Sequence, residues 1–224
     1  MNLLIPHSVR GCEKIRVGKN HDGGYVLLND LHRTSVAICG GLNDDDSFEI
    51  ALLNKGIKVL AFDHTESYTF QHQDRGYQWF KVPLSKFESS NSILDLALSG
   101  YNDYSAILKI DIEGDEWEMF EKTNAQTYKK IRQFVCEFHN FPMNNRALET
   151  FQQISKNFKV VHVHGNNWAG AFFYGNQVIP TVIEITFANI DCYDLSIQGD
   201  QYPTVYDQPN HDVQPDYILG KFTI

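Results

Sequence analysis

AILKIDIEGDEWEMF, residues 106–120, begins as an apolar run and ends with the spacing of a helix. The run 106–110 is typical of a buried strand, and a helix is expected after Gly114. The turn between the two carries four carboxylates, at Asp111, Glu113, Asp115 and Glu116. In an open α/β sheet such a turn lies at the carboxyl end of a strand, which is where these sheets bind their ligands. The stretch therefore predicts a βα unit with an acidic binding site.

Short β-rich runs alternate with helical patterns through the first three-quarters of the chain, which indicates βαβ units. Strands are expected at 35–39, 58–62, 78–82, 106–110, 133–138, 159–164 and, late in the chain, 180–187. Helices are expected at 44–55, 90–98, after 114 and at 146–156. No helical pattern precedes the late strand, so we expect it to enter antiparallel. The fold class predicted is α/β, with about seven strands in a mostly parallel sheet and helices on both faces.

The chain has 224 residues and 42% hydrophobic content, which suits one domain over 1–224. Residues 1–34 are expected to form an N-terminal hairpin or lid. Residues 189–224 are polar and rich in Tyr, Pro, Asn and Asp, so an irregular tail is expected there. The sequence does not indicate an oligomeric state.

The net charge of -9 argues against a nucleic acid as partner. No apolar run approaches ~18 residues, and the first residues, MNLLIPHSVRGCEK, lack the pattern of a signal peptide. A cytoplasmic protein without membrane insertion is therefore expected. The four cysteines lie far apart, and Cys39 and Cys136 fall in apolar runs, so all four are expected to be reduced.

A glycine turn, Gly40-Gly41, follows the first predicted strand, and three aspartates, Asp44 to Asp46, follow the turn. Glycine lets a ligand approach the backbone, and a helix N-terminus offers free N–H groups. Three aspartates would repel a pyrophosphate, so the turn suits a ligand with a cationic or hydroxyl-bearing end. The alternative is an ordinary tight turn whose acids favour the helix dipole.

Asp63 ends the second predicted strand about 20 residues after the glycine turn, where nucleotide-binding folds place the acid that binds a ribose. Together the two features favour an adenosine-type ligand. The turn departs from G-x-G-x-x-G because it lacks the second glycine, although Asn43 can adopt the left-handed backbone needed there.

With these features in place, the chain resembles S-adenosylmethionine-dependent methyltransferases of the FkbM type. The segment KIDIEGDEWE is similar to that family's K-I-D-x-E-G-x-E, and DGGYVLL, SFE, AFDHT, CEFH and VHVHGNN are supporting matches. The resemblance spans about residues 16–187. It implies a Rossmann-like class I methyltransferase fold and S-adenosylmethionine as cofactor.

The resemblance also implies which residues bind the cofactor. Gly41 would back the methionine part, Asp63 would hold the ribose, and Asp111 would face the amino or sulfonium end. The adenine would lie near Pro83 and Leu84. The full set of expected cofactor-binding residues is Asp22, Gly40, Gly41, Asp45, Ser47, Asp63, His64, Pro83, Asp111 and Glu113.

Methyl transfer requires an acceptor atom held in line with the sulfur and relieved of its proton. Glu137 and His139 end the fifth predicted strand, and His164 ends the sixth, so we expect them at adjacent carboxyl ends. The expected catalytic residues are His139, Asp111, Glu137 and His164, although a single histidine is more often structural. The expected acceptor-binding residues are Lys19, Tyr25, His164, Asn166 and Trp168.

A divalent metal is the alternative use of this cluster, since Asp111, Glu137, His139 and His164 are ligand types that suit Mn or Mg. It is not the favoured interpretation, because no tight ligand spacing enforces it, and no metal ligand is assigned. Asp115 and Glu116 are explained by the helix dipole and solvation alone.

The function expected from the resemblance is O-methylation of a small polar acceptor. The leading acceptor is a hydroxyl of a sugar or nucleotide-linked sugar in surface-polysaccharide or natural-product biosynthesis. The alternative, from another class, is an adenosine-nucleotide-binding module or sensor without catalysis.

Overall fold

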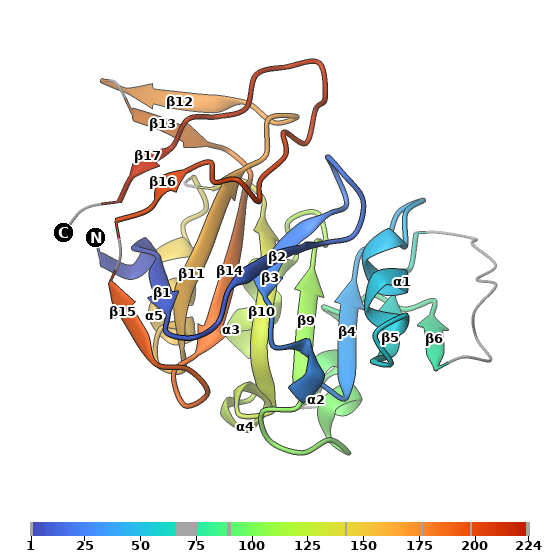
Figure 1. Ribbon diagram of the computed structural model, residues 1–224. Helices are drawn as coiled ribbons and strands as arrows, with labels where there is room; N and C mark the ends of the chain where they lie inside the picture. Colours follow the sequence, from blue (N-terminus) through green and yellow to red (C-terminus); the bar gives the residue numbers. More distant parts are fainter. Residues whose placement is uncertain are drawn as a thin grey trace.

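The structure is a computed structural model that describes residues 2–65, 76–88, 91–141, 143–175, 177–197 and 199–222. Its centre is a seven-stranded sheet with the order β11-β14-β10-β9-β4-β5-β6 (Figure 1). The strands are β4 (Val36–Gly40), β5 (Lys58–Phe62), β6 (Tyr77–Phe80), β9 (Ala106–Ile110), β10 (Ile131–Phe138), β11 (Phe158–Gly165) and β14 (Ile183–Asn189).

Numbered by their order along the chain, these strands are arranged 3-2-1-4-5-7-6. The late strand β14 is antiparallel to both of its neighbours, β10 and β11, whereas the other neighbouring pairs are parallel. The predicted α/β fold, a mostly parallel sheet with an antiparallel late strand, is confirmed.

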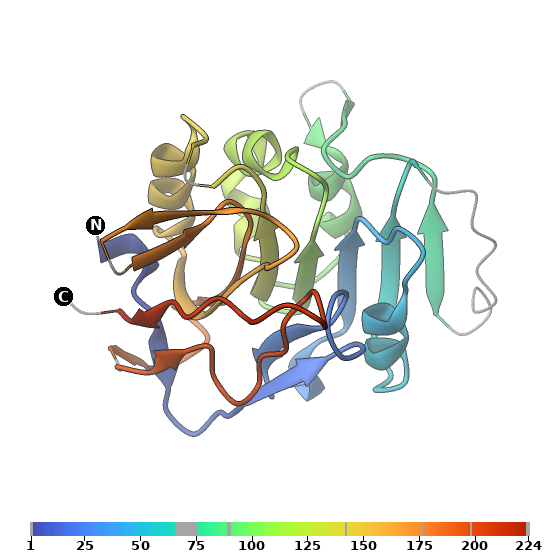
Figure 2. The same cartoon turned by 90° about the horizontal axis from the view of Figure 1, so that it is seen from above.

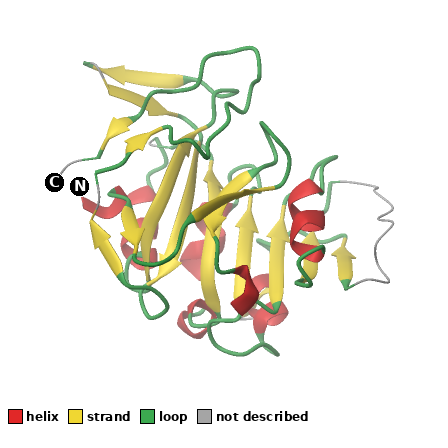
Figure 3. Ribbon diagram, in the orientation of Figure 1, coloured by secondary structure: helices red, strands yellow, loops and turns green. Residues whose placement is uncertain are grey.

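Alternating side chains of the strands form two apolar layers, one on each face of the sheet. Ile38, Leu108 and Phe134 pack on one face with α2 (Ile93–Leu98), α3 (Glu116–Lys122), α4 (Ala125–Tyr128) and α5 (Ala147–Ile154). Ala37, Ile107 and Val135 pack on the other with α1 (Ser47–Leu53) and the hairpin of β2 (Lys14–Val17) and β3 (Tyr25–Leu28). Helices therefore cover both faces, as Figure 3 shows by colour.

The carboxyl edge of the parallel strands is overlaid by segments far apart in the sequence (Figures 1 and 2). One is the hairpin of β12 (Ala171–Tyr174) and β13 (Gln177–Pro180), which the sequence did not predict. The other is the C-terminal segment 199–222, with short strands β16 (Gln201–Tyr202) and β17 (Gly220–Lys221). This edge is therefore partly covered by added segments.

The remaining short elements lie outside the central sheet. They are η1 (Asn2–Leu4), β1 (His7–Val9), η2 (Leu31–Arg33), β7 (Phe87–Glu88), β8 (Asn91–Ser92) and β15 (Leu195–Ile197). Strand β15 pairs with β1, so part of the segment expected to be an irregular tail is extended and joined to the N-terminal region.

Two predicted bounds are wrong for identifiable reasons. Helix α1 begins at Ser47 rather than at Asp44, because the Asp45 carboxylate accepts hydrogen bonds from the Ser47 N–H and hydroxyl and favours a turn there. The late strand begins at Ile183, because Pro180 belongs to β13. Within the described residues, none of the helices has the length and apolar character needed to cross a membrane.

Candidate active site

A cleft of about 620 Å³ opens at the carboxyl edge, between the β2–β3 loop, the glycine turn and the ends of β9 and β10. Most residues predicted for the site line it: Lys19, Asp22, Tyr25, Gly41, Asp45, Asp63, His64, Pro83, Asp111, Glu113, Glu137, His139, Asn166 and Trp168. Three of the predicted residues, Gly40, Ser47 and His164, are not among its lining.

The glycine turn is fixed by the neighbouring strand. Gly41 has φ +74, and a Cβ placed on it would lie 1.5 Å from the carbonyl oxygen of Asp111. The turn continues through Asn43 at φ +50, the left-handed conformation expected for it. Gly41 is therefore required by the close approach of two strand ends, whatever ligand binds there.

Lys109 lies beneath this turn, inside the quoted KIDIEGDE segment, although the sequence suggested no role for it. Its ammonium group donates to the Gly41 carbonyl and lies 3.7 Å from Asp111 Oδ2. Burial lowers the pKa of Lys109, but the nearby carboxylates of Asp111 and Glu49 raise it more, so the group stays charged. Burial also raises the pKa of Glu49 to about 7. The buried lysine joins the glycine turn to the acid at the end of β9.

Asp63 ends β5 as predicted, but its carboxylate is occupied by the protein. Oδ2 accepts hydrogen bonds from the N–H groups of Leu42 and Asn43, and Oδ1 accepts two from Thr65. Burial raises the pKa of Asp63, but these hydrogen bonds outweigh it and lower the pKa overall. A carboxylate has about four acceptor sites. A ribose contact would therefore have to replace one of the bonds from Thr65.

The β2–β3 loop is tied to the start of α1. Lys19 forms an ion pair of 3.2 Å with Asp45, and its N–H donates to the Ser47 hydroxyl. Ser47 thus supports the wall of the cleft from behind instead of facing a ligand.

The other end of the cleft gathers the predicted catalytic side chains. One ligand atom from each of Asp111, Glu137 and His139 lies within 4.8 Å of the other two. The Tyr25 hydroxyl donates to Asp111 Oδ2 at 2.8 Å, and the Asn166 amide donates to Glu137 Oε1 at 2.6 Å. Burial, followed by the charges of Asp111 and Glu184, raises the pKa of Glu137 well above its usual range.

Glu116 has a different role from the one expected. It is fully buried, and its carboxylate accepts hydrogen bonds from the N–H groups of Gly114 and His139. The same Oε1 atom lies 3.3 Å from His139 Nδ1. Burial lowers the pKa of His139, but Glu116, Asp111 and Glu113 raise it overall. Glu116 is a positioning residue for His139, so the expectation that dipole and solvation explain it is wrong.

His164 is not beside His139, because β14 lies between β10 and β11. The expectation of adjacent carboxyl ends is therefore wrong. The His164 ring is buried and pairs with Glu184 at 3.3 Å and with Asp216 at 3.0 Å. Burial lowers its pKa, but these two carboxylates raise it to about 10. The charged ring joins the sheet to the C-terminal segment.

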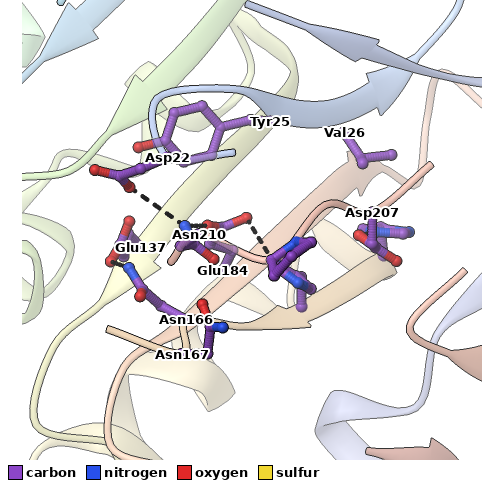
Figure 4. Close-up of polar contacts among 12 residues, drawn as sticks. Asp22, Tyr25, Val26, Glu137, Asn166, Asn167, Glu184, Asp207 and Asn210 are labelled. Carbon is purple, nitrogen blue, oxygen red and sulfur yellow. Dashed lines mark hydrogen bonds and ion pairs between the residues drawn. The ribbon is translucent and has the colours of Figure 1, made fainter. Parts of the chain in front are cut away.

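A polar network connects the C-terminal segment to the cleft, as Figure 4 shows. The Asn210 amide donates to Asp22 at 3.3 Å and to Glu184 at 2.7 Å, which links the C-terminal segment to the β2–β3 loop and to β14. His21 in the same loop is 2.9 Å from the Pro209 carbonyl. Sequence reasoning missed Asn210 and Asp216, since polar residues in a segment expected to be irregular gave no signal of distant partners, and it missed Glu184, which lies in the predicted late strand.

Trp168 stands at the mouth of the cleft. Its side chain is 61% exposed, and its ring centroid lies 3.9 Å from that of His211. An exposed aromatic ring in this place can stack on a flat or apolar face of a bound molecule.

No protein-family model matches the sequence, and no curated protein matches it. Solved structures of similar shape exist at low identity. A provisionally named hemolysin from Streptococcus thermophilus has 11% identity and a TM-score of 0.44, over 85% of this chain and 75% of that chain. The human methyltransferase 10 domain containing protein has 13% identity and a TM-score of 0.42, over 72% and 73%.

A third structure is the Burkholderia thailandensis 1,6-didemethyltoxoflavin-N1-methyltransferase, with bound 1,6-didemethyltoxoflavin and S-adenosylhomocysteine. It has 11% identity and a TM-score of 0.41, over 71% of this chain and 72% of that chain. Similarity at these levels assigns no family to the chain.

Proposed function

We propose that the protein is an S-adenosylmethionine-dependent methyltransferase of the FkbM type that methylates a hydroxyl of a small polar acceptor. The leading acceptor is a sugar or a nucleotide-linked sugar. The observation that carries the proposal is the acidic cleft at the carboxyl edge of the 3-2-1-4-5-7-6 sheet, where such sheets bind ligands.

The chemistry of the cleft suits the cofactor. Its volume of about 620 Å³ falls in the range of small-molecule sites. Carboxylates of Asp22, Asp111 and Glu137 line it, which favours a ligand bearing a sulfonium and an α-amino group over a pyrophosphate. When bound, S-adenosylmethionine supplies an activated methyl group. The proposed ribose contact of Asp63 requires a hydroxyl to take the place of Thr65 on Oδ1.

The remaining work falls to residues of the chain. Asp111, Glu137 and His139 are proposed to hold the acceptor oxygen and relieve it of its proton, with Glu116 orienting the imidazole. Trp168 is proposed to stack on the acceptor at the mouth. The net charge of -9 and the acidic lining favour a small acceptor over a nucleic acid.

Ligand-dependent thermal unfolding tests the cofactor. S-adenosylhomocysteine is expected to raise Tm in a concentration-dependent way, and NAD is expected to leave it unchanged. Stabilisation by NAD alone would refute a methyltransferase. A screen of hydroxylated acceptors, nucleotide sugars included, with methyl-labelled S-adenosylmethionine then identifies the substrate class. Transfer of label to a nitrogen-only acceptor would contradict O-methylation.

A further inference from the structure

We propose that Asp111, Glu137 and His139 bind one divalent cation at the acceptor end of the cleft. The use of this ion in catalysis rests on the proposed function, whereas its binding does not. The position within the fold is the first argument. Asp111 follows β9, and Glu137 and His139 lie at the end of the neighbouring parallel strand β10. Parallel strands end at one edge, so the three side chains meet there.

The distances are close to those of a coordination site. The three candidate ligand atoms lie within 4.8 Å of one another. Three oxygen and nitrogen ligands spread evenly at ~2.2 Å from one ion lie ~3.8 Å apart, so side-chain movements of up to about 1 Å complete the site.

In the described part of the chain, the supporting hydrogen bonds use one ligand atom of each side chain and leave the other open towards the cleft. Tyr25 binds Oδ2 of Asp111, Asn166 binds Oε1 of Glu137, and Glu116 lies on Nδ1 of His139. Among the described residues no hydrogen bond is made to Asp111 Oδ1 or Glu137 Oε2, so these atoms and His139 Nε2 are open to an ion. Ligands held from behind by a hydroxyl, an amide and a carboxylate are the arrangement that fixes tautomer and orientation in metal sites.

The carboxylates around His139 also favour a bound cation. Glu116 lies at Nδ1 of His139, and Nε2 on the other side of the ring faces further acids. This Nε2 atom lies 3.9 Å from Asp111 Oδ1, 3.4 Å from Glu113 and 3.9 Å from Glu137. Glu137 is only 4% exposed, and among the described residues its sole hydrogen-bond donor is Asn166, on Oε1. A buried carboxylate with one donor is costly.

Lys109 is a fixed cation beside the cluster, and it cannot neutralise the whole of it. Its ammonium group already binds the Gly41 carbonyl and lies beside Asp111 Oδ2, the oxygen that Tyr25 also uses. The carboxylates of Glu137 and Glu113 remain. Two oxygens and one imidazole suit Mn²⁺ or Mg²⁺, with the open positions facing the cleft. Those positions fit an acceptor with two adjacent oxygens, such as a vicinal diol.

Titration of the chelator-stripped protein with Mn²⁺, followed by loss of the free-ion EPR signal, tests the site. One saturable site is expected. Glu137→Gln and His139→Gln should each weaken it by at least ~10-fold. Asp44→Asn, a cleft acid outside the cluster, is the matched control and should leave the affinity unchanged. Thermal unfolding of each variant shows that it folds.

Absence of saturable Mn²⁺ binding up to about 1 mM would overturn the site. Equal losses in Asp44→Asn and Glu137→Gln would do the same, because they indicate diffuse attraction by the acidic cleft. Thermal stabilisation by S-adenosylhomocysteine is measured on the same samples. If that stabilisation persists without Mn²⁺ binding, only the ion site fails, and if Mn²⁺ binds without it, only the methyltransferase proposal fails.

Discussion

Asp63 and Glu137 are both buried carboxylates at the carboxyl edge of one sheet, but the chain holds them in opposite ways. Asp63 accepts four hydrogen bonds, three of them from backbone N–H groups, and its pKa is lowered. Within the described ranges, Glu137 accepts one hydrogen bond and faces Asp111, and its pKa is raised. The first acid builds the turn that backs the cleft. The second is desolvated beside another acid, an environment that is useful where a cation or a proton is handled.

The largest effect is expected at the end of the cleft that holds Glu137. His139→Ala should lower methyl transfer to the acceptor found in the screen by roughly 10²-fold or more, whether the imidazole takes a proton or holds an ion. Binding of S-adenosylhomocysteine, measured by calorimetry, should persist, because His139 is placed at the acceptor end.

Two variants on α3 sharpen this result. Glu118→Gln changes an exposed acid of the same helix and should leave turnover unchanged. Glu116→Gln should reduce turnover less than His139→Ala does, since Glu116 acts only through the imidazole. Full turnover in His139→Ala would show that His139 has no part in the mechanism. The functional difference drawn between the Glu137 end and the Asp63 end of the cleft would then be wrong.

A smaller effect, on the free energy of unfolding, is expected at the end of the cleft that holds Asp63. In Asp63→Asn the amide NH₂ must face an N–H donor, either that of Leu42 or that of Thr65. The unfolding free energy, measured by urea denaturation, should therefore fall by about 2 kcal/mol. The folded pKa of Asp63 is lowered, so its contribution is present above the unfolded value of about 3.9 and is lost as the pH falls through the folded pKa.

The difference between wild type and Asp63→Asn should therefore be largest near pH 7 and shrink in acid. A difference that stays constant from pH 7 to pH 3 would contradict a role based on the carboxylate charge. It would indicate that shape alone matters at this position.

The two acids also differ in how much of their environment could be predicted from the sequence. Apolar runs ended by Gly40, Asp63 and Asp111 predicted the strands and their shared edge, because strand ends follow from local pattern. The insertion of β14 between β10 and β11 is a long-range choice, so the separation of His164 from His139 was not readable. In the sequence, Glu116 cannot be told from a solvated acid in the first turn of a helix. Only the packing of the folded chain shows that it is buried.

The C-terminal segment gives the same lesson. Its composition predicted irregular structure, and most of it is irregular, but Asn210 and Asp216 bind side chains of the loop and the sheet. No spacing in the sequence specifies such partners, because they depend on where the chain returns in space.

The smallest effect is expected from Tyr25→Phe, which tests whether the β2–β3 hairpin orients the acid at the end of β9. The Tyr25 side chain is buried, and its hydroxyl donates to Asp111 at 2.8 Å. Asp111 keeps Lys109 at 3.7 Å and is partly exposed, so water can replace the lost donor. The affinity for S-adenosylmethionine, measured by calorimetry, should fall about fivefold, near 1 kcal/mol. An unchanged affinity would mean that Lys109 alone orients Asp111. If the turnover of Tyr25→Phe fell as far as that of His139→Ala, the Tyr25 hydroxyl itself would be in contact with the reacting groups.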